Sequence, residues 1–317
     1  MVTGGAGYIG AHVVKALRDR GEPVVVLDDL STGRPGRIGD ASLVRGSVLD
    51  RDLVEATIRE HRVGGIIHIA AKKQVGESVE RPLFYYRENV VGLVGLLEAA
   101  TTNGVESFVF SSSAATYGMP DVDQVTEDTP LAPLSPYGET KVIGEWLGRA
   151  TAASCELRAI SLRYFNVAGA AAPDLGDPAV LNLIPMALRA LTAGEPPKIF
   201  GDDYPTPDGT CIRDYVHVAD VADAHVRALE HLSEGGGSAT YNIGRGVGSS
   251  VREVLAMVAE TTGISTEPVV APRRSGDPAR IVATVDRIRT ELGWTARYDL
   301  RSMVESAWEA WQASPPV

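Results

Sequence analysis

The stretch Met1-Val2-Thr3-Gly4-Gly5-Ala6-Gly7-Tyr8-Ile9-Gly10 decides how this chain folds. Its glycines at positions 4, 7 and 10 give the spacing G-x-x-G-x-x-G, and an amphipathic segment that ends near Gly21 follows them. The β-branched run 23–29 comes next and is typical of a buried parallel strand. Only three residues precede the glycines, so we expect a short first strand. Strand, glycine turn, helix and strand together predict a βαβ unit.

A glycine turn at the start of a helix lets the backbone approach a pyrophosphate group. Asp28 ends the second strand, 18 positions after Gly10. A carboxylate at that place can bind a ribose 2′-hydroxyl and would repel a 2′-phosphate. We therefore predict a dinucleotide site that favours NAD over NADP, although the glycine turn alone could serve only tight packing.

Strands and helices continue to alternate along the first half of the chain. The sequence favours strands over 41–45, 64–71, 105–110 and 157–162, and helices over 52–60, 89–102 and 136–152. This alternation predicts an α/β fold with a doubly wound, parallel, Rossmann-type sheet. After about residue 166 prolines and glycines become frequent. We expect an NAD-binding part over 1–165 and a smaller mixed α/β substrate lobe over 166–317, some segments of which return to the first part.

The composition excludes several classes of function. Hydrophobic residues make up 44% of the chain and charged residues 22%, as in a soluble globular protein. A net charge of -11 without a basic run argues against binding to nucleic acid. The sequence has neither an apolar run of membrane-spanning length nor a signal peptide at its start. Two cysteines, Cys155 and Cys211, lack metal-ligand spacing. We expect a cytoplasmic protein without a metal site or a membrane partner.

The most reactive pair of side chains lies in Ser135-Pro136-Tyr137-Gly138-Glu139-Thr140-Lys141. Residues four apart share a face of a helix, so the Tyr137 hydroxyl and the Lys141 ammonium can face one space. A nearby ammonium lowers the pKa of a phenol and makes it a usable base. Ser113 follows the strand predicted to end at residue 110 and would project into the same cleft. A Tyr–Lys pair with this spacing is too common to indicate a catalytic site by itself. Together with the glycine turn, Ser113, Tyr137 and Lys141 are predicted to be catalytic.

Together these motifs resemble the extended short-chain dehydrogenase/reductase superfamily. Further stretches narrow the resemblance to the UDP-glucose (UDP-galactose) 4-epimerase family and cover essentially the whole chain. They are Val75-Gly76-Glu77-Ser78-Val79, Phe110-Ser111-Ser112-Ser113-Ala114, Arg163-Tyr164-Phe165-Asn166, 200–206, 208–218 and Ala271-Pro272-Arg273-Arg274-Ser275-Gly276-Asp277.

The resemblance implies an isomerase that interconverts UDP-galactose and UDP-glucose. Tyr137 would remove the proton from the sugar 4-hydroxyl while the hydride at C4 passes to bound NAD. The 4-keto sugar would turn over in the pocket, and the hydride would return to its opposite face. NAD would stay tightly bound without being consumed. Ser113 would orient the 4-hydroxyl, and Lys141 and the nicotinamide charge would favour the phenolate.

The resemblance also implies two sets of binding residues. The NAD set comprises Gly4, Gly7, Tyr8, Ile9, Gly10, Asp28, Asp29, Leu30, Ser47, Val48, Ile69, Ala70, Lys73, Asn89, Ser113, Tyr137, Lys141 and Phe165. The UDP-sugar set comprises Asn166, Asn182, Leu183, Ile199, Phe200, Arg213, Tyr215, Arg274, Asp277 and Ile281. Arginines suit a diphosphate because their planar fork binds phosphate oxygens bidentately. A local ion pair is the alternative role for Arg213 and for Asp277.

Three departures from the family pattern affect the adenine contact, the sugar pocket and the first strand. Ser47 replaces a common aspartate near the adenine. Ile281 stands where some members have a polar hydroxyl beside the sugar's 2-substituent, so acceptance of N-acetylated sugars stays open. The chain starts about three residues later than is usual in the family, which should weaken the first strand.

Several alternatives remain at this stage. The rivals are a nucleotide-sugar dehydratase or decarboxylase, or an epimerase acting on UDP-N-acetylglucosamine, UDP-uronate or UDP-pentose. Ala114-Ala115 follow Ser113 where dehydratases carry Asp-Glu, which argues against elimination. A non-catalytic NAD-binding regulator would not need Ser113, Tyr137 and Lys141. The apolar helix over 89–102 is either buried in the monomer or pairs with helix 136–152 as a homodimer face.

Overall fold

The computed structural model describes residues 1–274 and 276–315, so Ser275 of the quoted motif lies outside the described residues. A sheet of seven strands forms its centre, in the order β10-β6-β5-β4-β1-β2-β3. Every neighbouring pair in this sheet is parallel. The strands are β1 (Val2–Thr3), β2 (Val25–Asp28), β3 (Ser42–Arg45), β4 (Gly65–His68), β5 (Ser107–Ser113), β6 (Arg158–Tyr164) and β10 (Ala239–Ile243). The predicted doubly wound parallel fold is confirmed.

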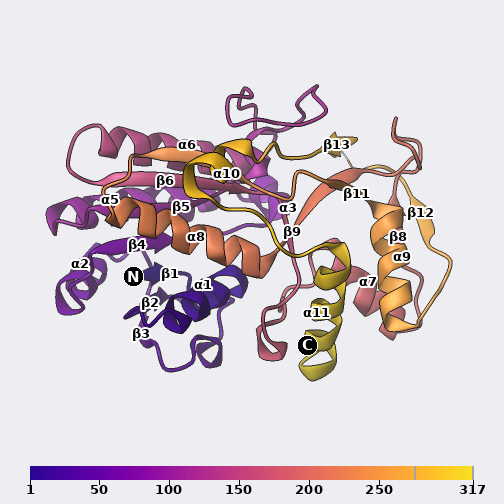
Figure 1. The fold of residues 1–317 in the computed structure, drawn as a ribbon, viewed down its shortest axis with the longest axis horizontal. Helices are drawn as coiled ribbons and strands as arrows, with labels where there is room; N and C mark the ends of the chain where they lie inside the picture. The colour runs from indigo at the N-terminus through magenta and orange to yellow at the C-terminus, as the bar shows by residue number, and fades with distance from the viewer. Residues whose placement is uncertain (275, 316–317) are drawn as a thin grey trace.

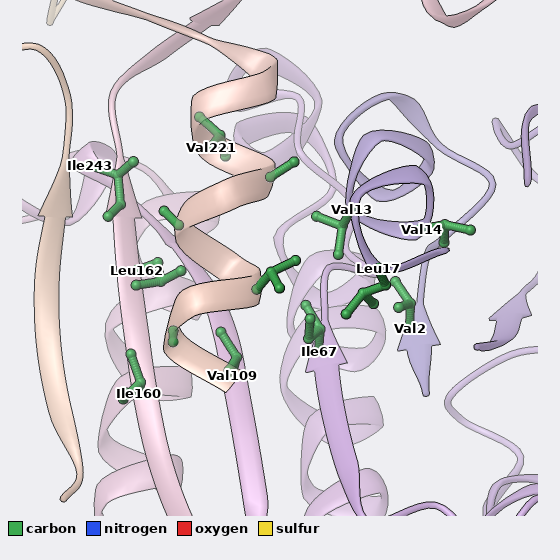
Figure 2. Close-up of a cluster of buried hydrophobic side chains, with 14 of the residues drawn as sticks. Val2, Val13, Val14, Leu17, Ile67, Val109, Ile160, Leu162, Val221 and Ile243 are labelled. Carbon is green, nitrogen blue, oxygen red and sulfur yellow. The ribbon is translucent and has the colours of Figure 1, made fainter. Parts of the chain in front are cut away.

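Helices cover both faces of this sheet. On one face lie α1 (Tyr8–Asp19) and α8 (Val218–Ser233), which pack against each other as Figure 2 shows. Their buried valines and leucines meet strand residues such as Ile67 and Leu162 in one apolar cluster. On the other face α2 (Arg51–Glu60) and α5 (Gly92–Thr102) form a second cluster with Leu27 and Phe108, beside α6 (Pro136–Ala152). Strand order reverses on the two sides of β1, which places the ligand crevice of such folds at its carboxyl end.

Two elements differ from the sequence-based expectation. Strand β5 does not end at Phe110 but continues to Ser113, because its three serines keep pairing with β6 as far as Tyr164. The helix expected over 89–102 is divided, because its first residues belong to a π-helix (Tyr86–Val91) and only the rest form α5. Two short helices, α3 (Val75–Glu80) and α4 (Pro82–Tyr85), precede the π-helix. Such π-helical turns often occur at functional sites.

The smaller lobe lies at the right of Figure 1. Its four-stranded mixed sheet contains β7 (Asn166–Ala168), β9 (Ile212–His217), β11 (Gly248–Ser250) and β13 (Arg280–Ile281). A parallel pair, β8 (Lys198–Phe200) and β12 (Val269–Ala271), lies beside α7 (Leu183–Thr192) and α9 (Val251–Thr262). Helix α11 (Leu300–Ala313) packs against α9 and α7, whereas α10 (Asp286–Leu292) lies against β10 and α8 of the larger part. In the chain as a whole, 3-10 turns occur at Pro35–Ile38, Ala114–Thr116 and Pro173–Leu175.

Chain order and spatial order diverge after residue 166. Strand β10 is the edge strand of the central sheet, where it pairs with β6, and α8 covers that sheet. Both elements come from the second half of the chain. Within the described residues, no helix has the length and apolar character needed to cross a lipid bilayer.

Candidate active site

Helix α6 begins with two signals that its sequence carries. The Ser135 side chain accepts a hydrogen bond from the Gly138 amide at 3.2 Å, and Pro136 occupies the first helical position. Two glycines then bring the helix close to β5. A Cβ on Gly138 would lie 2.8 Å from the Ala115 carbonyl oxygen, and a Cβ on Gly144 would overlap the Phe110 ring. The helix therefore rests directly on the strand that ends at Ser113.

Tyr137 lies in the first turn of α6 and its side chain is buried. Burial raises the pKa of the Tyr137 phenol, while the nearby Ser113 hydroxyl lowers it. Ser113 Oγ also accepts a hydrogen bond from the Ala115 amide at 3.1 Å. Because burial is the larger of the two effects, the protein by itself favours the neutral phenol. Ionisation of Tyr137 requires additional positive charge nearby.

Lys141 lies one turn further along the same face. Its Nζ donates a hydrogen bond to the Ser111 carbonyl oxygen at 2.8 Å and lies 5.8 Å from the centre of the Tyr137 ring. Burial lowers the pKa of Lys141 to about 8, and the charge of Glu145 acts in the opposite direction. The side chain is thus still mostly an ammonium at neutral pH, and it contributes positive charge near the phenol.

Two buried histidines lie beneath this lysine. His68 on β4 forms a 2.7 Å hydrogen bond with the Thr3 hydroxyl, and His225 on α8 forms one of 2.7 Å with the Ser111 hydroxyl. Burial, with a smaller contribution from the Lys141 charge, lowers the pKa of His68 to about 3 and that of His225 to about 4. Both rings are therefore neutral at physiological pH and leave Lys141 as the cation of this cluster.

The glycine turn has the shape that a dinucleotide requires. Gly4 has a φ of +70°, and a Cβ there would lie 2.7 Å from the Ala70 amide nitrogen. A Cβ on Gly10 would overlap the Gly4 carbonyl oxygen. Gly7 is the N-cap of α1 and has no side-chain cap, so the first amides of the helix remain available to an anion.

Asp28 closes this crevice at the end of β2. Its carboxylate is buried and accepts hydrogen bonds from the amides of Ala6 at 2.9 Å and Leu30 at 2.8 Å. These bonds hold Leu30 in the left-handed region, at a φ of 57°. Burial raises the pKa of Asp28 and the two amides lower it. Each carboxylate oxygen retains a lone pair for a ribose hydroxyl, so the turn and Asp28 together fit NAD.

The other residues of the predicted NAD set surround this crevice in different ways. Ile69 and Ala70 follow β4, and both of their amides donate to the Thr3 carbonyl oxygen. Ser47 Oγ accepts from the Leu49 amide at 3.1 Å, and Val48 is buried. The structure thus brings the ends of β1, β3 and β4 to one edge of the sheet. Phe165, just after β6, is also buried, whereas Lys73 is exposed.

Asn89 and Tyr8 use their polar atoms within the protein. The Asn89 side chain bonds to both the amide and the carbonyl of Lys72 and reaches the Thr140 hydroxyl at 3.1 Å. It therefore ties the segment after β4 to α6, from within the π-helix. The Tyr8 hydroxyl donates to the Gly169 carbonyl oxygen at 2.5 Å and so ties α1 to the smaller lobe. Ile9, the next residue, is partly buried.

Strand register gathers several of the predicted substrate residues. On β9, Arg213 pairs with Ile281 of β13 and Tyr215 pairs with Asn166 of β7. Arg213 and Tyr215 are two apart, so both side chains leave the same face of the strand. Asn166 is exposed, while Tyr215 and Ile281 are buried. Three strands of the small sheet thus present these side chains together.

Two of the predicted substrate residues form an ion pair with each other. Arg213 Nη2 contacts the Asp277 carboxylate, and the Arg213 side chain is largely buried. Arg274 does not pair with Asp277; its guanidinium lies over the Phe200 ring, 3.9 Å from the ring centre. Arginine side chains beside an aromatic ring are suited to binding a nucleotide diphosphate.

The remaining predicted substrate residues, Ile199, Phe200, Asn182 and Leu183, lie on or beside β8 and α7. Ile199 is buried in the core of the smaller lobe, whereas the neighbouring Phe200 is partly exposed. Asn182 donates to Asp177 at 3.0 Å at the start of α7, and Leu183 beside it is partly buried.

Sequence reasoning missed the groups behind the Tyr137–Lys141 face. Tyr164 lies close enough to Tyr137 and Ser111 for both to influence its pKa, which burial raises. Glu145 and Arg163 form a buried ion pair at 2.6 Å. The spacing of Glu145, four residues after Lys141, was a usable signal, whereas the partnership with Arg163 requires the sheet.

Comparisons with known proteins agree with this geometry. The model of the NAD dependent epimerase/dehydratase family matches residues 1–244. A UDP-glucose 4-epimerase of Azospirillum brasilense is 48% identical, over 98% of this chain and 91% of that protein. The crystal structure of UDP-glucose 4-epimerase from Brucella ovis in complex with NAD has a TM-score of 0.92 at 42% identity and covers 96% of both chains.

A third relative was solved with two ligands. The UDP-glucose 4-epimerase from Bifidobacterium longum, in complex with NAD+ and UDP, has a TM-score of 0.92 at 33% identity and covers 99% of this chain and 98% of its own. These comparisons confirm the resemblance predicted from the motifs. The chain belongs to the NAD dependent epimerase/dehydratase family.

Proposed function

We propose that this protein is an NAD-dependent UDP-glucose 4-epimerase, which interconverts UDP-galactose and UDP-glucose. The observation that carries the proposal is the cluster of Ser113, Tyr137 and Lys141 at the carboxyl end of β5, beside a crevice that fits NAD. The full-length similarity to UDP-glucose 4-epimerases supports the same reaction.

The chain's own residues supply the proton chemistry. Tyr137 takes the proton from the sugar 4-hydroxyl, and Ser113, close to the phenol, holds that hydroxyl in line. NAD, held by the glycine turn and Asp28, would supply the reversible hydride chemistry at the sugar C4, and its nicotinamide would add positive charge near the phenol. Lys141 adds a second positive charge, fixed on the Ser111 carbonyl.

The remaining predicted residues divide between the two ligands. The glycine turn and the α1 N-terminus would hold the pyrophosphate, and Asp28 would hold a ribose of NAD. Arg213 and Arg274 would hold the substrate diphosphate, with Phe200 beside the uracil. In the protein alone Asp277 neutralises Arg213, so substrate phosphates would compete with that carboxylate.

Purified protein tests this proposal directly. Denaturation should release NAD in near-stoichiometric amounts, and the native protein should convert UDP-galactose to UDP-glucose without added cofactor. A protein that releases NAD but converts neither sugar nucleotide would contradict the epimerase assignment. Parallel assays with UDP-N-acetylgalactosamine determine whether Ile281 leaves room for a larger 2-substituent.

We also propose a homodimer that buries α5 and α6. The inner face of α5 is occupied by the monomer core, where Leu93 and Leu96 are fully buried. Apolar side chains remain on the outer face: Val91 is 57% exposed, Val94 37% and Trp146 on α6 52%. Two long helices that present such residues fit an isologous four-helix contact.

The two unpaired cysteines support a reducing, cytoplasmic location.

A charge on this face tests the dimer. Trp146→Glu should yield monomers in analytical ultracentrifugation at micromolar concentration. The matched control is Val269→Glu, at an exposed apolar residue of β12 that lies outside the proposed face. A wild-type protein that sediments as a monomer would contradict the assembly.

A further inference from the structure

A buried ion pair lies one turn beyond Lys141 on the inner face of α6. Arg163 on β6 donates from Nη2 to Glu145 Oε2 at 2.6 Å and from Nε to Glu145 Oε1 at 2.8 Å. Both side chains are 6% exposed. Two parallel hydrogen bonds between a guanidinium and a carboxylate define the relative position of the two groups closely. The mechanism described above does not use this pair.

The pair connects α6 to both strands beneath it. Ser112 on β5 donates to Glu145 Oε1 at 2.5 Å, while Arg163 itself belongs to β6. Glu145, Lys141 and Tyr137 are spaced by four residues and therefore share one face of the helix. Because the helix backbone is rigid, fixing Glu145 against two strands also fixes the height of Tyr137 above the sheet.

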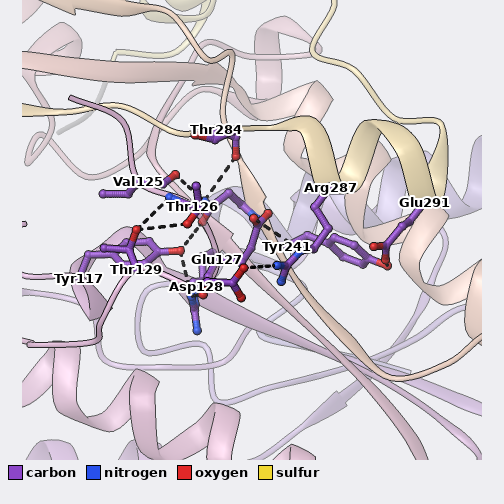
Figure 3. Close-up of polar contacts among 12 residues, drawn as sticks. Tyr117, Val125, Thr126, Glu127, Asp128, Thr129, Tyr241, Thr284, Arg287 and Glu291 are labelled. Carbon is purple, nitrogen blue, oxygen red and sulfur yellow. Dashed lines mark hydrogen bonds and ion pairs between the residues drawn. The ribbon is translucent and has the colours of Figure 1, made fainter. Parts of the chain in front are cut away.

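The network extends from Arg163 toward the segment that follows β5. Its Nη1 donates to the Tyr117 hydroxyl at 2.9 Å and to the Glu127 carbonyl oxygen at 3.0 Å. The Tyr117 hydroxyl in turn donates to Asn242 Oδ1 on β10 at 2.6 Å. The backbone amide of Asn242 donates to the Glu127 carboxylate at 2.9 Å. Figure 3 shows how Tyr117 and Glu127 gather with β10 and α10 around this point. The pair thus has a second set of partners that hold Arg163 in place.

We propose that Glu145 and Arg163 are positioning residues for the epimerisation, which hold Tyr137 and Lys141 at the end of the sheet and give Lys141 a buried anionic neighbour. This inference rests on the proposed function, because it assigns a role within the same reaction. Neither side chain need touch the sugar nucleotide or NAD.

The surroundings of Lys141 make the charge of Glu145 matter. The charged and titratable groups that face this lysine are Tyr137 and Glu145 from α6, His68 from β4, His225 from α8 and, near Ser111, Tyr164 from β6. The histidines are neutral because burial lowers their pKa values to about 3 and about 4. Burial lowers the pKa of Lys141 to about 8, and Glu145 is the group that raises it. Loss of the Glu145 charge should therefore move the deprotonation of Lys141 to lower pH.

Glu145→Gln tests the proposal in the full-length, NAD-loaded protein. The amide keeps the shape and can still bond to Arg163, but it removes the charge. We expect kcat per folded, NAD-loaded enzyme to fall about 10- to 100-fold, with KM for UDP-galactose almost unchanged. We also expect the alkaline limb of the kcat profile to move to lower pH. The control is Asp223→Asn on α8, which removes a partly buried ion pair with Arg20 at the end of α1 and should leave kcat and the pH profile unchanged.

A purely structural pair would give a different result. Breaking a buried pair can unfold a protein, because one charge is left uncompensated. The double variant Glu145→Gln/Arg163→Met removes both charges, and for it we expect the same loss of kcat and the same shift of the alkaline limb. If folded single or double variants keep the wild-type kcat and pH profile, the positioning role is wrong. Wild-type protein without turnover would instead contradict the proposed function itself.

Discussion

The Lys141 ammonium points to the carbonyl oxygen of Ser111, at 2.8 Å, while its nitrogen lies 5.8 Å from the centre of the Tyr137 ring. The lysine therefore acts on the phenol through its field and not through a hydrogen bond to the ring's hydroxyl. Burial of Tyr137 raises its pKa, so this field and the charge of bound NAD act together against the cost of forming a phenolate.

Lys141→Met should retain the fold, because methionine fills a similar volume without a charge. We expect kcat to fall roughly 10²-fold and the optimum to move to higher pH, since a phenol without a neighbouring cation ionises later. Steady-state rates between pH 6 and 10 measure both effects. Lys15→Met, at an exposed surface pair on α1, is the control. An unchanged pH optimum in Lys141→Met would show that the charge of Lys141 does not assist the ionisation of Tyr137.

Asp28→Ala should weaken the hold on the cofactor. The substitution removes the acceptor of two backbone amides, those of Ala6 and Leu30, and also the proposed ribose partner. We expect purified protein to contain substoichiometric NAD and to regain turnover when NAD is added. The measurement is cofactor content after denaturation, with Asp19→Asn, at an exposed pair with Lys15, as the control. Full NAD content in Asp28→Ala would contradict the placement of the ribose.

Arg213→Gln should act on substrate binding and leave the cofactor in place. A charge-assisted bond to a phosphate contributes about 1.5–3 kcal/mol, so KM for UDP-galactose should rise roughly 10- to 100-fold. The control is Arg301→Gln, which removes an exposed arginine of α11 that pairs with Glu260 of α9. Binding of UDP alone, measured by calorimetry, should weaken in parallel. Equal UDP affinity in the variant and the wild type would show that Arg213 serves only its pair with Asp277.

The buried histidines make the protein sensitive to acid. The folded pKa of His68, about 3, lies below its ordinary value of 6.5, so between these values only the unfolded chain binds the proton. The free energy of unfolding should therefore fall as pH drops below 6.5, by roughly 1.4 kcal/mol per pH unit for such a group. His68→Gln should show a shallower slope in urea titrations between pH 7.5 and 5. His61→Gln, at an exposed position, should keep the wild-type slope. Identical slopes in all three proteins would show that buried His68 does not cause the loss of stability in acid.

Much of the first half of the fold could be predicted from local sequence. Helix α6 has the predicted bounds because Ser135 and Pro136 are strong start signals. The end of β5 could not be placed in the same way, since serines commonly form turns and only pairing with β6 keeps Ser113 in the strand. The π-helix before α5 has no simple signal in its composition.

Contacts between distant segments account for what the sequence could not show. Strand β10 joins the central sheet although it lies far along the chain from β6, and Arg213 meets Asp277 across 64 residues. The predicted NAD-site residue Asn89 also has contacts that the sequence does not show: its side-chain amide bonds to Lys72 and Thr140, which only the folded chain brings near. Tyr137 and Lys141 were predictable as a pair because four residues on one helix fix their geometry. The burial that sets their pKa values was not.

The most direct test of the account is the turnover of Tyr137→Phe. This variant keeps the ring and the packing of α6 and lacks only the hydroxyl that would take the proton. We predict that it retains NAD and binds UDP-galactose, while kcat falls roughly 10²- to 10⁴-fold. A folded, NAD-loaded Tyr137→Phe protein that interconverts UDP-galactose and UDP-glucose at close to the wild-type rate would contradict the central claim.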